Sequence, residues 1–173
     1  MNQYLTVSKD GEVNTSFPGA IIEVKQIKGG YLMVYHMGSG FRQHRLVMDH
    51  FQPDYPPELK LVDHINGIRD DNRLINLRRV SPSLNNLNRA GVLGCYFENA
   101  AWLDRNIVPA DRSHFTARHL WIAHFTYKGV KQEVGAYKYS RQAILASRKA
   151  KELFICQELQ RIWAEYELDR EQN

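Results

Sequence analysis

The sequence predicts an α+β protein made of two small modules, residues 1–90 and residues 91–173. Short apolar runs alternate with short helical segments in the first half, whereas three candidate strands and one long helix fill the second. Gly91–Gly94 lies between the halves and is typical of a linker. The composition is 43% hydrophobic and 24% charged, without an apolar run near the ~20 residues of a membrane span, which is typical of a soluble globular protein.

The first module begins with β-structure. Two apolar runs, Ala20–Ile27 and Tyr31–His36, flank Lys28-Gly29-Gly30, and a Gly-Gly step between such runs predicts a hairpin. A short helix over 44–51 follows, because Leu46, Val47 and Phe51 recur at helical spacing before Pro53.

A strand, a loop, a second strand and a helix complete this module. Leu59–Val62 is an apolar strand that leads into Asp63 and His64, and Asn66-Gly67 then makes a turn. Residues 70–76 suit a helical turn, and Leu77–Val80 a second strand. Ser81 is an N-cap for a helix with Pro82 at its first position. Asp63 and His64 therefore stand at a strand end.

The second module is predicted to be a three-stranded antiparallel sheet with a long C-terminal helix. Its strands are Cys95–Phe97, Leu120–Tyr127 and Gln132–Tyr137. From Ser140 to about Glu171 there is no Gly or Pro, and alanines recur on one helix face. Four large residues later in the helix need burial: Leu159, Ile162, Trp163 and Tyr166. They extend the protein's own core or, alternatively, cover the first module or a partner subunit.

The positive charge is concentrated in two segments. Residues 60–90 carry a net charge of +3 and residues 112–151 one of +8, where nine basic residues accompany one acidic residue, and the acidic remainder of the chain brings the total to +4. Such a segment attracts a polyanion and releases its counterions on binding. The alternative interpretation is a solvated basic face.

Asp63 and His64 are suited to phosphodiester hydrolysis, which needs a base for water and a cation held in a rigid frame. Asp63 offers a hard oxygen ligand, and His64 a base whose ordinary pKa lies near working pH. Adjacent strand residues point to opposite sides, so the strand must end here if both serve one site.

The segment DHINGIRDDNRLINLRRVSPSLNNLNR, with HRLVMDHF before it, resembles the HNH endonuclease family, specifically the phage and intron homing enzymes. The resemblance implies a ββα-metal (His-Me finger) unit around one divalent ion, Mg²⁺ or Mn²⁺. It makes Asp63 a metal ligand, His64 the general base, Asn76 the residue that fixes the loop and the imidazole orientation, and Asn85 the second ligand. Asn85 stands where the wider class often has His, which implies weak binding of a hard metal and not tight binding of zinc.

Other polar residues of this segment have simpler interpretations. Five arginines are candidates for phosphate contacts, with one or two of them alternatively only solvated: Arg69, Arg73, Arg78, Arg79 and Arg89. Asn72, Asn86 and Asn88 are interpreted as caps or turn formers. His44 and His50 are interpreted as structural, with the alternative that His44 lines the site.

Residues 91–154 resemble the plant ethylene-response-factor (APETALA-type) DNA-binding domain, through Gly94-Cys-Tyr-Phe97, Trp121-Ile-Ala-His-Phe125, Gly135-Ala-Tyr137 and the alanine-striped helix. The resemblance implies a sheet that lies in the DNA major groove. The candidate contacts are Arg118, Trp121, His124, Lys128, Lys131 and Tyr137, and Trp121 is alternatively a core residue. Residues 98–117 depart from the family, since they are longer and more acidic than its first connection. His114, His119 and His124 do not predict zinc, because no cysteine pair accompanies them.

The expected function is that of a metal-dependent endonuclease that nicks or cuts double-stranded DNA and leaves 5′-phosphate and 3′-hydroxyl ends. Three alternatives stay open: a non-catalytic DNA-binding regulator on a degenerate nuclease scaffold, a structural or interaction protein, and an RNA-directed or non-specific nuclease. One catalytic set per chain predicts a nicking monomer, although the last helix leaves a dimer open.

We also expect a cytoplasmic setting. The N-terminus lacks the basic start and apolar stretch of a secretory signal, and Cys95 and Cys156 stand far apart. By the first resemblance the chain is encoded by a phage or mobile element in a bacterial host.

Overall fold

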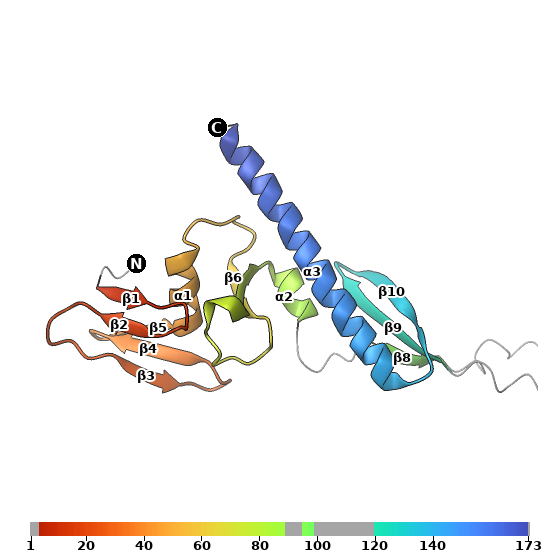
Figure 1. Cartoon of the computed structure of the whole chain (residues 1–173), viewed down its shortest axis with the longest axis horizontal. Coiled ribbons are helices and arrows are strands. Elements are labelled where there is room, and N and C mark those ends of the chain that lie inside the picture. The colour runs from red at the N-terminus through yellow and green to blue at the C-terminus, as the bar shows by residue number, and fades with distance from the viewer. Residues whose placement is uncertain (1–3, 89–94, 99–119, 173) are drawn as a thin grey trace, which may run out of the picture. The chain divides into compact units, whose positions relative to one another are not determined.

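The computed structural model describes residues 4–88, 95–98 and 120–172 (Figure 1). The chain divides into two compact units, residues 1–88 with 159–173, and residues 89–158. This division differs from a boundary near residue 90 in one respect, because the last part of the C-terminal helix groups with the first unit. The mixed fold with a ββα segment and a long C-terminal helix is confirmed. No helix among the described residues is long and apolar enough to cross a membrane.

The first unit opens with five short strands in two sheets. They are β1 (Leu5–Val7), β2 (Val13–Thr15), β3 (Glu23–Gln26), β4 (Leu32–His36) and β5 (Ser39–Arg42). β1 pairs with β2, and the second sheet has the order β3-β4-β5, all antiparallel. The predicted Gly-Gly hairpin is present between β3 and β4, where Gly29 and Gly30 have φ values of 95° and 85° that favour glycine.

Helix α1 (Gln43–Phe51) follows β5 directly, and its buried residues contribute to two separate apolar clusters. Leu46 joins Leu5 and Val34 in one apolar cluster. Val47 and Met48 join Leu77 in a second cluster. The helix thus connects the N-terminal strands to the segment that carries Asp63 and His64.

That segment contains β6 (Leu61–His64), the 3-10 turn η1 (Leu74–Asn76), β7 (Leu77–Val80) and α2 (Pro82–Leu87). β6 pairs antiparallel with β7. The predicted cap is confirmed, since Ser81 Oγ accepts from the backbone nitrogen of Leu84 at 3.3 Å and Pro82 begins the helix. β6 starts two residues later than predicted, because the Leu59 backbone nitrogen donates to the Pro56 carbonyl in a turn and Leu59 is fully buried there.

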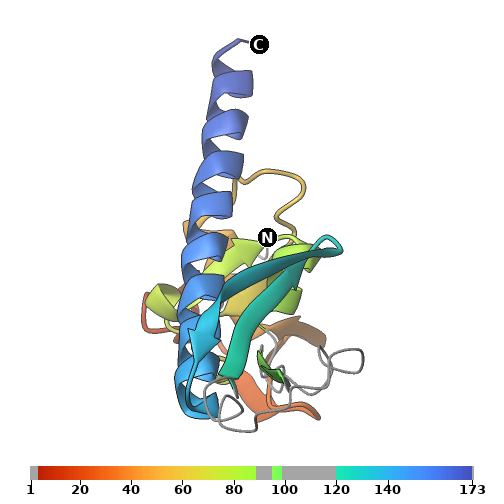
Figure 2. The ribbon, with the colours of Figure 1, turned by 90° about the vertical axis from the view of Figure 1, so that its right-hand side faces the viewer.

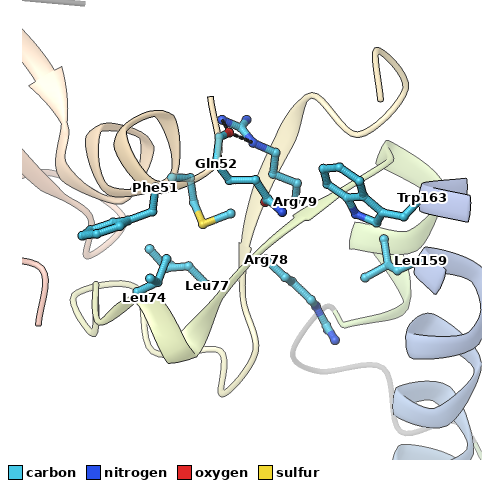
Figure 3. Close-up of a pocket in the computed structure, with 9 residues that line it drawn as sticks. Phe51, Gln52, Leu74, Leu77, Arg78, Arg79, Leu159 and Trp163 are labelled. Atoms are coloured by element: carbon cyan, nitrogen blue, oxygen red, sulfur yellow. Dashed lines mark hydrogen bonds between the residues drawn. The ribbon is translucent and has the colours of Figure 1, made fainter. Parts of the chain in front are cut away.

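The last part of helix α3 (Ser140–Glu171) packs on the first unit. Leu159 and Trp163 line a cavity of about 320 Å³ together with residues of α1, η1 and β7 (Figure 3). Buried Arg79 borders the same cavity and donates to the Gln52 carbonyl at 3.1 and 3.2 Å. Tyr166 Oη donates to Asp54 Oδ1 at 2.6 Å. These contacts favour the interpretation in which the large residues of the helix cover the first module.

The second unit contains β8 (Cys95–Glu98), β9 (Leu120–Tyr127), β10 (Val130–Tyr137) and the first part of α3 (Figure 2). The sheet order is β10-β9-β8, and both pairs are antiparallel. The ring of Phe154 on α3 lies 5.3 Å from Phe125 and 4.9 Å from Tyr127, measured between centroids. Ser147 Oγ donates to the His124 carbonyl at 2.8 Å. The small residues Ala143 and Ser147 are fully buried, which permits this close approach of helix and sheet.

Candidate active site

The candidate site is built on the end of strand β6. Asp63 and His64 are its last two residues, with exposed fractions of 8% and 4%. In the β6–β7 register Asp63 lies opposite Arg78 and His64 lies opposite Leu77. Because neighbouring strand residues point to opposite sides, Asp63 and His64 meet different partners.

The Asp63 carboxylate is held by Arg78 from the opposite strand. Arg78 Nε donates to Asp63 Oδ2 at 3.0 Å, and Nη2 lies 3.0 Å from the same oxygen. Both side chains are about nine-tenths buried. A buried carboxylate is costly unless a cation and hydrogen bonds compensate it, and Arg78 supplies both to Asp63.

Asn88, directly after helix α2, provides the other contacts of Asp63. Its Nδ2 donates to Asp63 Oδ2 at 2.9 Å and Oδ1 at 3.2 Å, and to the His64 carbonyl at 2.9 Å. The amide therefore connects α2 to the end of β6. The sequence analysis interpreted Asn88 as a cap or turn former. The usable signal was its i, i+3 spacing from Asn85, which places the two amides on neighbouring positions of one helix surface.

Asn72 holds the imidazole of His64. The Asn72 Oδ1 atom lies 3.0 Å from His64 Nε2, and only 3% of Asn72 is exposed. The sequence analysis assigned the imidazole orientation to Asn76, and the structure instead brings Asn72 to this ring. No local pattern marks Asn72, because the contact depends on how the loop between β6 and η1 folds back.

Asn76 organises the loop itself, as the resemblance implies. Its Oδ1 accepts from the Asn66 backbone nitrogen at 3.0 Å, and its Nδ2 donates to Asn66 Oδ1 at 3.0 Å and to the Asp71 carbonyl at 2.8 Å. The Ile65 backbone nitrogen donates to the Asn76 carbonyl at 2.9 Å. One amide thus ties both ends of the loop together.

Aromatic rings surround the other side of His64. The centroid of the His44 ring lies 5.2 Å from that of His64, and the Tyr31 ring lies 5.1 Å from His44 and 6.0 Å from His64. Burial, with smaller contributions from His64, Arg45 and Arg42, lowers the pKa of His44 from 6.5 to about 3. His44 is therefore neutral at working pH and lines the site, the alternative noted for it from sequence.

Oxygen donors around Asp63 suit a hard divalent cation. Asp63 supplies a carboxylate, and Asn85 lies on α2, the helix whose C-cap Asn88 contacts that carboxylate through its Nδ2. Magnesium and manganese prefer such oxygen ligands, whereas a tight zinc site needs several His or Cys ligands. Within the described ranges no group of three His, Cys, Asp or Glu residues could hold a metal ion. His114 and His119 lie outside those ranges.

Residues 42–87 match the family model described as HNH endonuclease. The chain carries an HNH endonuclease domain. A solved structure described as "DNA binding and cleavage by the HNH homing endonuclease I-HmuI" is 36% identical over 50% of this chain and 51% of that chain, with a TM-score of 0.42. The match thus spans about half the length of that protein. No curated protein matches the chain.

The arginines of the HNH domain differ in their freedom to meet a phosphate. Arg78 is buried on Asp63, as described above. Arg73 is exposed but donates to both oxygens of Asp71 at 2.8 Å, and this hydrogen bonding lowers the pKa of Asp71 to about 2. Arg69 Nη1 donates to the Gly29 carbonyl at 2.7 Å, and its guanidinium lies 5.1 Å from the Tyr31 ring centroid. Arg89 lies outside the described residues.

The predicted DNA contacts outside the HNH domain fall on two faces of the second sheet. In the β9–β10 register, Trp121 pairs with Tyr137 and His124 pairs with Glu133. Alternation places Trp121 on the side of Phe125, which packs on α3, and His124 on the opposite side. Lys131 is exposed 3.1 Å from Glu133, and Lys128 is exposed at the hairpin tip. The part of the chain that the structure describes does not include Arg118.

Proposed function

We propose that this chain is a divalent-cation-dependent endonuclease that hydrolyses phosphodiester bonds of double-stranded DNA. The observation that carries the proposal is the arrangement at the end of β6, within the segment that matches the HNH family. There a carboxylate and an oriented imidazole stand on adjacent residues of one rigid strand. These are the groups that hydrolysis of a phosphodiester requires.

Asp63 and Asn85 would hold the cation, Mg²⁺ or Mn²⁺. The donors fit, because a carboxylate and amide oxygens are hard ligands. Arg78 and Asn88 support this site by fixing the direction of the Asp63 carboxylate. A divalent ion bound there supplies neutralisation of the charge that develops on the phosphate and on the leaving 3′-oxygen.

His64 acts as the general base in the proposed reaction. Its Nε2 faces Asn72, so Nδ1 accepts the proton of the attacking water. The water oxygen forms a bond to phosphorus, and the bond from phosphorus to the 3′-oxygen breaks. The products carry 5′-phosphate and 3′-hydroxyl ends. Asn76 keeps the following loop in place, and the neutral ring of His44 packs against the imidazole.

Double-stranded DNA is the proposed partner. Arg69 and Arg73 are exposed on the loop beside the site and supply positive charge for the backbone. In the second unit Lys128, Lys131 and His124 would contribute contacts from the hairpin tip and the sheet face turned away from α3. A monomer with one such site nicks one strand at a time.

A non-catalytic DNA-binding regulator is the competing proposal. One observation favours it, because the Asp63 carboxylate is already engaged by Arg78 and Asn88. In a nuclease these contacts coexist with a cation, whereas in a regulator they replace it. Cation dependence of strand scission therefore separates the two proposals.

The test is cleavage of supercoiled and genomic DNA with Mg²⁺, with Mn²⁺ and with EDTA, followed on gels. We expect nicks that require the cation and disappear in His64→Ala. His50→Ala is the matched control, since His50 is an exposed histidine on α1 and should leave cleavage unchanged. Cation-independent DNA binding without scission of any substrate would favour the regulator.

A further inference from the structure

The turn between β1 and β2 lies against Asn72, the residue that contacts the proposed base. This turn, Ser8–Glu12, is outside the segment that matches the HNH family. We propose that Asn72 is a positioning residue that selects the Nε2-protonated tautomer of His64, and that the Ser8–Glu12 turn holds Asn72 in place. The inference rests on the proposed function only for its effect on cleavage.

The chemistry of the contact determines the tautomer. An amide oxygen can only accept a hydrogen bond, so Asn72 Oδ1 at 3.0 Å requires a proton on His64 Nε2. Nδ1 then carries the lone pair. In the neutral imidazole the contact thus directs the basic nitrogen away from Asn72.

Asn72 makes this contact while, among the described residues, the nitrogen of its own side-chain amide stays without a partner. Its side chain is buried, and within the described structure its Nδ2 atom has no hydrogen-bond partner. A buried amide group without a hydrogen-bond partner destabilises the fold. An apolar residue of similar size would avoid this cost, so packing alone does not explain an asparagine here.

The turn reaches the backbone of Asn72 closely. A Cβ atom added to Gly11 would lie 2.7 Å from the Asn72 carbonyl oxygen and 2.9 Å from its carbonyl carbon. The Leu74 backbone nitrogen donates to the Lys9 carbonyl at 2.8 Å, on the other side of Arg73. Gln43, buried on α1, donates from Nε2 to the Gly11 carbonyl at 2.7 Å and anchors the turn. Any side chain at position 11 therefore displaces either the turn or Asn72.

The first measurement is the tautomer of His64 by ¹⁵N–¹H correlation of its ring in metal-free protein, with His64→Gln used for assignment. We expect the Nε2-protonated pattern in the wild type and in Asn72→Asp, which keeps an acceptor. Asn72→Ala should give a mixture of tautomers. A Nδ1-protonated wild type, or the same pattern in Asn72→Ala as in the wild type, would overturn the inference.

The second measurement compares two glycine variants. Gly11 and Gly19 have φ values of 89° and 77°, so alanine is strained at both, but no atom lies within 4 Å of a Cβ at Gly19. We expect Gly11→Ala to disturb the His64 tautomer and to lower the kcat of cleavage by about 10–100-fold, a range typical of residues that orient a ligating or catalytic histidine. Gly19→Ala should resemble the wild type, and equal effects of the two variants would contradict the role of the turn.

The two readouts separate the inference from the proposed function. If no DNA is cleaved under any condition but the tautomer depends on Asn72 and on Gly11, the nuclease proposal fails and the positioning role stands. If cleavage occurs and neither Asn72→Ala nor Gly11→Ala changes the His64 tautomer or the kcat of cleavage, the positioning role fails and the nuclease proposal stands. If Gly11→Ala does not fold, Asn72→Ala still tests the positioning role of Asn72 through the tautomer of His64.

Discussion

Arg78 and Asp63 form a buried ion pair across strands β6 and β7, with both Nε and Nη2 at 3.0 Å from Oδ2. The pair joins the metal-ligand candidate to the strand that follows the active-site loop. In Arg78→Leu the carboxylate would remain buried without its cation.

We expect Arg78→Leu to lower the free energy of unfolding by about 3–5 kcal/mol in EDTA, the range for breaking a buried pair. Urea unfolding measures this change. Lys25→Ala is the control, since its pair with Glu23 at 2.8 Å is exposed and such pairs contribute little to stability. Equal losses in the two variants would show that burial of the Arg78 pair does not matter.

Asn88 is predicted to support Asp63 more than any other position near the end of α2. Asn88→Ala removes the donor to both carboxylate oxygens and to the His64 carbonyl, and we expect a loss of about 1–3 kcal/mol. Asn86→Ala on the exposed side of α2 is the matched control and should change stability by less than about 0.5 kcal/mol. Thermal unfolding without metal checks both.

The local elements could be predicted from the sequence because their signals are local. Ser81 and Pro82 indicate the start of α2, and the alanine spacing predicts α3. The start of β6 could not be placed as well, since Leu59 is as apolar as a strand residue and yet belongs to a turn with Pro56. Apolar character predicts burial there but not the backbone conformation.

The partners of the site residues were harder to predict than the residues themselves. The HNH motif identifies Asp63 and His64, but Asn72 reaches His64 only because the loop folds back, and Tyr31 comes from a hairpin outside the motif. Arg78 was predicted to contact phosphate because its charge allows it. In this structure the β6–β7 register places Arg78 opposite Asp63 and so makes Asp63 its partner. A sequence motif does not reveal this, because register depends on the pairing of whole strands.

The buried neutral His44 predicts a loss of stability in mild acid. Its pKa is about 3 in the folded protein and 6.5 in the unfolded chain, so the unfolded state alone takes up the proton between these values. The stabilisation is complete above about pH 6.5 and decreases as the pH falls toward 3. Between pH 7 and pH 5 this one group should cost up to about 2 kcal/mol.

Urea unfolding of the wild type and of His44→Gln at pH 7 and pH 5 tests this expectation. The other histidines titrate in both proteins, so the quantity of interest is the difference between their pH dependences. We expect a smaller decrease in His44→Gln. A decrease of the same size in both proteins would mean that His44 is not responsible for the pH dependence.

DNA binding by the second unit should depend strongly on salt, because the segment 112–151 carries a net charge of +8. Each phosphate contact contributes about 0.9 to the slope of log K against log salt.

Lys128 is exposed at the tip between β9 and β10, and Lys128→Ala should reduce the slope by about 1 if it contacts a phosphate. Lys25→Ala, in the first unit, is the control for the loss of one positive charge. Fluorescence anisotropy with a labelled duplex at several salt concentrations measures both slopes. Because phosphate contacts read no sequence, the change in Lys128→Ala should be the same for unrelated duplexes, and a change confined to one duplex would instead indicate that Lys128 reads a base.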